Sequence, residues 1–422
     1  MTEGSPVTVT ETMTVTEPAR SGKRLPTGVA FYLLASIVIS FLAASSAPTP
    51  LYAIYQAKWG LTPVATTIVF GIYALAVLTA LLTLGRLSDH LGRRPVLLAA
   101  IGVQAIAMVV FATATGEPAL IVARIVQGLS TGAAVGAIGA GMLDIDRVRG
   151  TIANSVAPGI GTATGALVSA LVIQYLPAPT HLIYLALIGV FALQAIGVAS
   201  MRETVTAKPG ALATLVPDIR LPRAVRVPVL VAAPVLFAVW ALAGFYASLG
   251  PALIRGLVGS DSVVFGGLGL FVLAGVAALS TALLYNRPAA RVMALGIVAL
   301  ILGVTTTLLS IALSSPVGFF IGTAIAGVGF GSGFQGGIRT VMPLAEAHER
   351  AGLLSLLYVV CYAGMGGPAV IAGFLVVHAG GLLDTAREYG IAVMLLAGLA
   401  LIGLVRRPSA SAGLPNRVGA VA

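Results

Sequence analysis

The sequence predicts an all-α integral membrane protein with twelve transmembrane helices in two pseudo-symmetric bundles of six. Three observations predict this class: the composition, the number of long apolar stretches and the similarity of the two halves. Of the 422 residues, 58% are hydrophobic and 9% are charged, and the mean hydropathy is +1.03. A soluble domain carries roughly 25% charged residues, so we expect this chain to be solvated by lipid.

The same composition excludes several classes of protein. So apolar a chain is not expected to be a cytosolic enzyme, a nucleic-acid-binding module or a secreted disulfide-linked domain. Cys361 is the single cysteine, which excludes an internal disulfide bond and a cysteine-based metal cluster. The net charge of +10 is therefore attributed to basic loops beside the membrane and not to nucleic-acid binding.

Twelve stretches are apolar over the length of about 20 residues that crosses a membrane. They are 28–50, 63–84, 95–114, 118–142, 151–175, 181–201, 228–251, 263–285, 292–313, 316–340, 351–377 and 388–405. An even number of crossings places both ends of the chain on one side. Twenty of the 24 Lys and Arg residues lie on that side and three on the other. Because positive loops stay in the cytoplasm, we expect a multi-pass protein of the inner (plasma) membrane with both termini cytoplasmic.

The longest link between stretches, residues 202–227, contains three prolines and five basic residues. We expect it to be a cytoplasmic linker between a six-helix bundle at 28–201 and a second at 228–405. Residues 1–27 are expected to be a disordered cytoplasmic tail and residues 406–422 a second tail. An ungapped shift of 201 residues aligns Pro50 with Pro251 and Gly128 with Gly329, which favours duplication of one bundle.

A glycine-rich basic loop lies between the second and third stretches, with the sequence Gly85-Arg86-Leu87-Ser88-Asp89-His90-Leu91-Gly92-Arg93-Arg94-Pro95. Its glycines permit a tight turn, and its acid can accept hydrogen bonds at a helix start. A plain positively charged turn is the alternative interpretation. The loop resembles the signature loop of the major facilitator superfamily, G-x-L-[SA]-D-x-x-G-[RK]-[RK], at every fixed position. The resemblance covers residues 28 to 405 and implies the fold of that superfamily and a transport function.

The resemblance also implies a conformational gate at this loop. In that family the loop clamps the two halves together in the outward-facing state, with the acid near the start of the eleventh helix. A second partner comes from the loop after the fourth helix, where either acid could pair with Arg93 or could be a solvated surface charge. The residues assigned to the gate are Gly85, Asp89, Gly92, Arg93, Arg94, Asp144 and Asp146.

The fourth stretch contains an arginine about seven residues from its outer end, roughly 10 Å deep. An arginine inside a membrane is a functional candidate, although its side chain could instead extend to the interface. Arg124, Gln127 and Thr131 share one helix face, with Gly128 and Gly132 on a close-packing face beside it. The segment resembles the R-x-x-Q-G motif of the family. This resemblance implies that the arginine faces the central cavity and is linked to proton coupling.

The fifth stretch carries Pro158-Gly159-Ile160-Gly161-Thr162-Ala163-Thr164-Gly165-Ala166. Drug/proton antiporters of the family show G-P-x-x-G-G here. Gly161 and Gly165 match this motif, whereas Thr162 replaces its proline and Ala166 its second glycine. We assign Pro158, Gly161 and Gly165 to helix packing, which is also what such small residues do in any membrane bundle.

Further polar and aromatic residues lie on single faces of other stretches and are candidates for substrate contact. Helix–helix hydrogen bonding is the alternative for each of them. The candidates are Ser45, Thr49, Tyr52, Gln56, Trp240, Tyr246, Gln335, Tyr358 and Tyr362.

No Asp, Glu or Lys lies in the middle of any stretch, and no phosphate loop, metal cluster or nucleophile–base pair is evident. We therefore expect no enzyme activity, no cofactor and no metal. The leading hypothesis is a secondary transporter, acting as a monomer, that exports a hydrophobic or weakly polar small molecule by alternating access in exchange for protons. The alternative is uptake or facilitated transport of a small organic anion, with Arg124 as its counter-charge. A membrane enzyme or receptor is a third class, for which no catalytic constellation appears.

Overall fold

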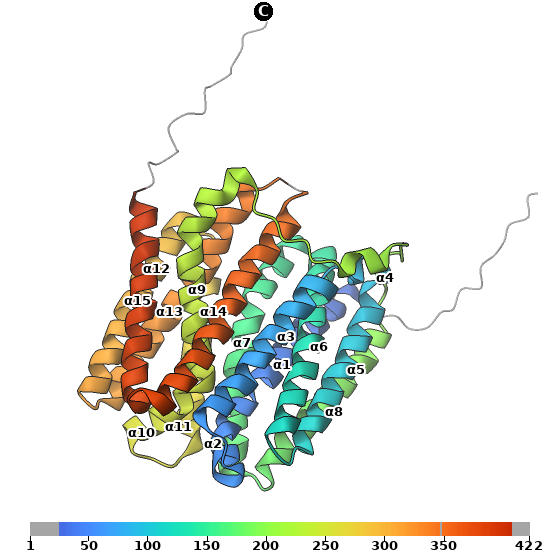
Figure 1. The fold of residues 1–422 in the computed structure, drawn as a ribbon. Helices are drawn as coiled ribbons and strands as arrows, with labels where there is room; N and C mark the ends of the chain where they lie inside the picture. Colours follow the sequence, from blue (N-terminus) through green and yellow to red (C-terminus); the bar gives the residue numbers. More distant parts are fainter. Residues whose placement is uncertain (1–24, 347, 407–422) are drawn as a thin grey trace, which may run out of the picture.

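The fold is known from a computed structural model that describes residues 25–346 and 348–406, and these are helical almost throughout (Figure 1). The α-helices are α1 (Thr27–Ser46), α2 (Pro48–Trp59), α3 (Pro63–Leu84), α4 (Ser88–Leu91), α5 (Arg93–Ala112), α6 (Glu117–Ile145), α7 (Arg147–Tyr175), α8 (Pro179–Ala199), α9 (Arg226–Ser248), α10 (Gly250–Val258), α11 (Val263–Leu283), α12 (Ala289–Ala312), α13 (Pro316–Val341), α14 (Arg350–His378) and α15 (Gly381–Val405). Short 3₁₀ helices are η1 (Ala211–Leu215), η2 (Arg223–Val225) and η3 (Met342–Leu344).

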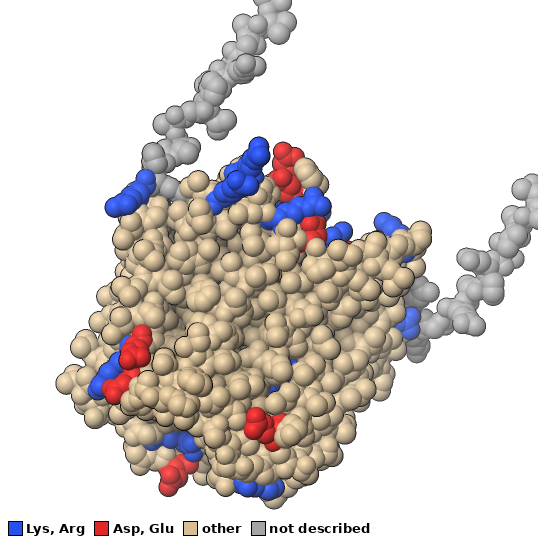
Figure 2. Space-filling model, in the orientation of Figure 1, with Lys and Arg blue, Asp and Glu red and all other residues tan. Residues whose placement is uncertain are grey.

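Twelve spans in the described chain are long and apolar enough to cross a membrane, as the sequence predicts. A chain in lipid must satisfy its backbone hydrogen bonds within each segment, and a helix does so. Figure 2 shows the result on one face: charged side chains gather toward the two ends, and a band of uncharged surface separates them.

The first span differs from the expected 28–50 because it continues as α2 to Trp59. Pro48 and Pro50 have no N–H group, so they interrupt the hydrogen-bond ladder, but a proline at the first position of a new helix is well tolerated. The seventh span repeats this arrangement: α9 is followed by α10, and Pro251 lies near the start of α10. The last span begins at Gly381, seven residues before the expected 388.

Two hydrophobic cores occupy the two halves of the chain. One core comprises buried residues between Ala30 and Met201, and the other residues between Val225 and Ala400 together with Ala166. The predicted boundaries of bundles, linker and tails stay predictions. Apart from residues 25–27 and 406, the predicted tails lie outside the described residues. The segment with η1 and η2 runs along one end of the molecule between α8 and α9 (Figure 1).

We call the end that carries residues 85–95 the motif end and the opposite end the α2 end. The two halves meet mainly where α3 packs on α14 and α7 packs on α11. On α3 and α14 the close contacts lie in the half toward the α2 end, where a Cβ atom on Gly71 would lie 2.8 Å from Val370 and one on Gly366 would lie 3.2 Å from Ala74. The structure is therefore closed between α3 and α14 at the α2 end.

Candidate functional site

A cavity of about 190 Å³ lies between the two halves. Eight helices contribute to its wall: α1, α2 and α3 on one side, α9, α13 and α14 on the other, and the pair α7 and α11. Its described lining residues include no Asp, Glu, Lys, Arg or His. Such a wall favours an uncharged, largely apolar molecule, because a charge here would lose its water without gaining a partner.

Aromatic rings from both halves form one wall of the cavity. Trp240 of α9 contacts Phe330 and Phe334 of α13 and Tyr362 of α14, with ring centroids 6.3, 5.6 and 5.0 Å away. Phe70 and Tyr73 of α3 line the same cavity and share a hydrophobic cluster with Trp240. The rings therefore contribute both to binding surface and to contact between the halves.

Four of the candidates for substrate contact line this cavity, namely Ser45, Thr49, Trp240 and Tyr362. The others make contacts between helices. Gln56 donates to Thr66 at 3.1 Å, Tyr246 shares a hydrogen bond with Thr323 at 2.7 Å, and Gln335 donates to the Thr281 carbonyl at 3.3 Å. Tyr358 packs beside Tyr362 of the same helix, with ring centroids 6.4 Å apart. Helical spacing identified shared faces, but packing decided that Gln56, Tyr246 and Gln335 meet other helices.

Arg124 is completely buried inside the first half. Its Nη1 atom donates to the Ser45 carbonyl and to Gln127 Oε1, each at 2.8 Å, and its Nη2 and Nε atoms donate to the Tyr52 hydroxyl at 2.7 and 3.3 Å. The guanidinium carbon lies 5.1 Å from the ring centre of Tyr73 and 5.6 Å from that of Phe111. Neutral acceptors and ring faces thus surround the charge, and no described carboxylate pairs with it.

The structure does not place Arg124 in the cavity wall, contrary to the expectation drawn from the R-x-x-Q-G resemblance. Ser45 and Tyr73 line the cavity, and the Arg124 guanidinium contacts both of them from the side away from the cavity. Gln127 and Thr131 are absent from the wall as well: Gln127 donates to the Ala44 carbonyl at 3.0 Å, and Thr131 donates to the carbonyl of Gln127 at 2.8 Å. This face of α6 therefore packs against α1 and α2 in the described conformation.

The predicted packing glycines lie where helices touch. A Cβ atom on Gly128 would lie 2.6 Å from that of Ala76 on α3, and one on Gly132 would lie 2.6 Å from the Val77 carbonyl. Gly161 and Gly165 of α7 meet the backbone of α1 at Ile39 and Ala43 in the same way. Pro158 lines the cavity in addition to lying inside α7, so its role is not packing alone.

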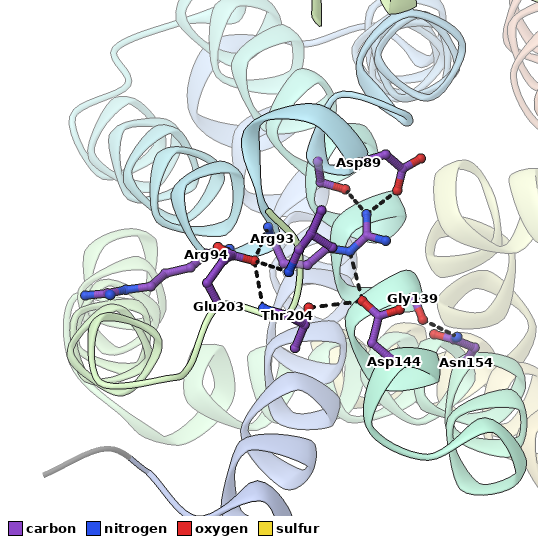
Figure 3. A network of polar contacts seen from close by, with 10 residues as sticks. Asp89, Arg93, Arg94, Gly139, Asp144, Asn154, Glu203 and Thr204 are labelled. Carbon is purple, nitrogen blue, oxygen red and sulfur yellow. Dashed lines mark hydrogen bonds and ion pairs between the residues drawn. The ribbon is translucent and has the colours of Figure 1, made fainter. Parts of the chain in front are cut away.

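At the motif end, Arg93 organises a network of polar contacts (Figure 3). Gly92, with φ +98°, takes a left-handed turn that favours glycine and starts α5 at the next residue. The Arg93 guanidinium donates to Ser88 Oγ at 2.7 Å, to the Asp89 carboxylate, and through Nε to Asp144 Oδ2 at 3.2 Å. The guanidinium therefore links the turn before α5 to the end of α6.

The two acids where α6 meets α7 have different partners. Asp144 binds Arg93 and accepts a hydrogen bond from Thr204 Oγ1 at 3.0 Å. Asp146 instead caps α7, accepting from the amides of Val148 and Arg149 at 3.0 and 2.9 Å. Only the first of these acids thus joins the Arg93 network in this conformation.

Glu203 belongs to the same network and was missed by the sequence analysis. Its carboxylate accepts hydrogen bonds from the backbone amides of Arg93 and Arg94 at 2.8 and 2.9 Å, and from the amide of Thr204 at 3.0 Å. The amides of Arg93 and Arg94 stand at the start of α5, where a negative charge is stabilised. The Arg94 guanidinium points away from the network (Figure 3). The sequence signal that could have identified Glu203 is its position as a single acid directly after the sixth span.

Asp89 contacts its own loop and not the eleventh span, which is α14. Its only ion-pair partner in the described chain is Arg93, and half of its side-chain surface is exposed. The neighbouring Arg86 reaches the linker instead, with 3.8 Å between Nη1 and Asp218 Oδ2. The contact expected for the outward-facing clamp is therefore not made in this conformation, which is closed at the α2 end.

Comparisons with known proteins agree with this architecture. The family model described as Major Facilitator Superfamily matches residues 33–370. A mutant of the nucleoside transporter NupG superposes with a TM-score of 0.66 at 14% identity, covering 90% of this chain and 98% of that one. The human organic anion transporter MFSD10 superposes with a TM-score of 0.63 at 17% identity, covering 90% of this chain and 99% of that one. No curated protein sequence gives a significant match. The match to the family model confirms the resemblance of the signature loop: the chain belongs to the major facilitator superfamily and is a membrane transporter, not an enzyme.

Proposed function

We propose that the protein exports an uncharged hydrophobic or weakly polar small molecule by alternating access, in exchange for protons. The observation that carries this proposal is the cavity between the two halves, whose described lining is mostly aromatic and aliphatic and has no charged residue. In alternating access the halves rock about a site near the middle of the membrane. Closure of α3 against α14 at the α2 end is one of the two arrangements that such a cycle needs.

The opposite arrangement would close the motif end, and the Arg93 network supports a role for that end as the gate. Asp89 is half exposed and pairs only within its own loop, so it remains free to accept from the start of α14 when the halves rock. The linker already touches that start, where the Arg220 amide donates to the Gly352 carbonyl at 3.2 Å. We propose that the Asp89 contact with α14 stabilises the outward-facing state.

Proton exchange is proposed from the sequence motif of α7 and not from a residue of the cavity wall. The described cavity wall contains no carboxylate and no histidine that could carry the proton. The support is the partial antiporter motif: its matching residues Gly161 and Gly165 lie in α7, the helix that lines the cavity through Pro158, Gly159 and Thr162.

Purified full-length protein in proteoliposomes tests the proposal. We expect efflux of a neutral aromatic dye to be faster than from protein-free vesicles, and to accelerate when a pH gradient is imposed. A rate that ignores the gradient would remove proton coupling and leave facilitated transport. No protein-dependent movement of any neutral dye would contradict the proposed substrate class.

The alternative is transport of a small organic anion. Arg124 supports it, because its charge lies directly behind the cavity residues Ser45 and Tyr73, and one structural neighbour transports organic anions. The same vesicles distinguish the two functions: an anionic dye that moves faster than its neutral analogue would favour the alternative.

We further propose that the motif end faces the cytoplasm of a cell whose inner (plasma) membrane holds the protein. The support is the excess of Lys and Arg on that side of the sequence. A reporter fused to the C-terminus should be active only inside the cell, and activity only outside would reverse this orientation.

A further inference from the structure

Two polar atoms in the cavity wall are buried without a hydrogen-bond partner among the described residues. They are Nε1 of Trp240 and Oγ1 of Thr49. They come from opposite halves, since Trp240 belongs to α9 and Thr49 to α2. Buried polar groups are nearly always paired in proteins, so an unpaired donor in a binding cavity indicates a group that a ligand completes.

Three aromatic rings hold the indole of Trp240 in place. Phe330, Phe334 and Tyr362 contact the indole with interplanar angles of 85°, 68° and 48°, so the rings surround it at steep angles. An indole N–H can donate but cannot accept. The ligand atom that meets it must therefore be an acceptor, and a carbonyl oxygen accepts more strongly than an aryl ether oxygen.

Thr49 lacks a partner for a local reason. A threonine in a helix commonly donates to the carbonyl one turn earlier, and for Thr49 that carbonyl belongs to Ser45. In this structure the Ser45 carbonyl accepts a hydrogen bond from Arg124 Nη1 at 2.8 Å and none from the Thr49 hydroxyl. The Thr49 hydroxyl, which is 1% exposed, is thus left to a ligand and can donate to it or accept from it.

The electrostatics of the wall disfavour a cation. None of the described lining residues is acidic, although a cage of aromatic rings would otherwise suit a quaternary ammonium ion. Arg124 occupies the far side of Tyr73, 5.1 Å from its ring centre, and opposes positive charge in the cavity. An anion would be attracted by this field, but neutral donors such as Trp240 Nε1 and Thr49 Oγ1 are poor compensation for its lost hydration.

On the basis of the proposed transport function, we infer that the substrate is an uncharged aromatic molecule with a hydrogen-bond acceptor, which it places against Trp240 Nε1 while its ring stacks in the aromatic wall. A second polar group on the same molecule meets Thr49. Recognition of a neutral acceptor, and exclusion of cations, are properties of these side chains and not of the fold.

Four probes of similar shape test this inference on full-length protein in lipid nanodiscs, with empty nanodiscs correcting for partition into lipid. They are 7-ethoxycoumarin, 2-ethoxynaphthalene without the carbonyl, coumarin-3-carboxylate and a 7-trimethylammonium coumarin. We expect 7-ethoxycoumarin to bind most tightly, by about five- to tenfold over the naphthalene, which is the worth of one hydrogen bond. The cation is expected to bind most weakly.

Trp240→Phe keeps a ring and removes the N–H group. Since that N–H group has no partner among the described residues, its loss should leave the fold intact. We expect affinity for 7-ethoxycoumarin to fall about five- to tenfold, with 2-ethoxynaphthalene changed less than about twofold. Trp59→Phe is the matched control, because Trp59 stacks on Tyr55 and does not line the cavity.

Several outcomes would overturn the inference without touching the proposed transport function. They are absence of 7-ethoxycoumarin binding, equal losses for both neutral probes in Trp240→Phe, and tighter binding of the cation or of the anion. The wild-type ranking needs no variant, so it decides the matter even if Trp240→Phe does not fold. Failure of transport itself shows separately, as absence of dye movement in proteoliposomes.

Discussion

The Glu203 carboxylate accepts a hydrogen bond from the Arg93 amide at 2.8 Å, although the two residues are 110 positions apart. Together with the bond from the Arg94 amide, this contact ties the start of α5 to the chain that follows α8. The side chain of the same Arg93 holds Asp89 and Asp144. Glu203 therefore positions the residue around which the motif end is built.

Glu203→Ala should weaken this end of the protein. Loss of a carboxylate that caps a helix costs about 0.5–2 kcal/mol of stability, and transport should fall because Arg93 is no longer held. Thermal unfolding in detergent and dye efflux from proteoliposomes measure the two effects. Glu388→Ala, at an exposed position of α15, is the matched control. Unchanged unfolding and transport in Glu203→Ala would show that the cap is dispensable.

Asp144→Asn should impair transport, because it removes the charge that pairs with Arg93 Nε. Asp146→Asn provides a close comparison, since asparagine caps a helix about as well as aspartate and Asp146 makes no contact with Arg93. We expect Asp144→Asn and Asp89→Asn to reach the membrane normally but to lose most transport, and Asp146→Asn to stay near wild type. Equal rates in all three variants would reduce the loop to a topological anchor.

Arg124 is expected to require both its charge and its planar shape. Arg124→Lys keeps the charge, so partial activity should remain. It loses the planar guanidinium that donates to three acceptors, so activity should be below that of wild type. Arg124→Gln should retain almost none. Transport at equal membrane abundance measures both, and near-normal, equal rates would show that the guanidinium is not needed.

Tyr52→Phe examines the surroundings of the same group. The Tyr52 hydroxyl accepts from both Nη2 and Nε of Arg124, and a buried donor that loses its acceptor costs about 1–3 kcal/mol. A lower unfolding temperature than that of wild type is therefore expected. Tyr32→Phe is the control, because Tyr32 is 69% exposed. An unfolding temperature equal to that of the control would mean that another group replaces the acceptor.

Gly373→Leu should open the α2 end. A side chain at this position of α14 would overlap Thr67 of α3, so closure between the halves becomes unfavourable. Spin labels on α3 and α14 in a Cys361→Ala background should report a longer distance between these helices. Dye transport should also be slower. Gly367→Leu on the same helix has nothing within 4 Å of its Cβ position and should change neither. An unchanged distance distribution in Gly373→Leu would show that this contact does not control closure.

The polar residues illustrate how far sequence reasoning reached. Arg124 and Gln127 are three positions apart, so a shared helix face followed from helical geometry. The resemblance implied that Arg124 faces the cavity, with extension to the membrane interface as the alternative, whereas the structure places α1 and α2 against this face. Tyr246 and Gln335 were candidates for the same reason and contact other helices. Thr49 and Trp240 do line the cavity, but only the packing of their neighbours shows that their polar atoms lack partners.

By itself, the sequence determined the helices and the number of crossings. Lipid offers the backbone no hydrogen bonds, so an apolar stretch of about 20 residues must form its bonds within itself, and this requirement is local. The tertiary structure decided which acid pairs with Arg93, why Glu203 belongs beside it, and that Arg124 lies behind the cavity wall. Those outcomes depend on contacts between residues up to 110 positions apart in the chain. Such contacts form where small residues such as Gly128 and Gly165 let neighbouring helices approach closely.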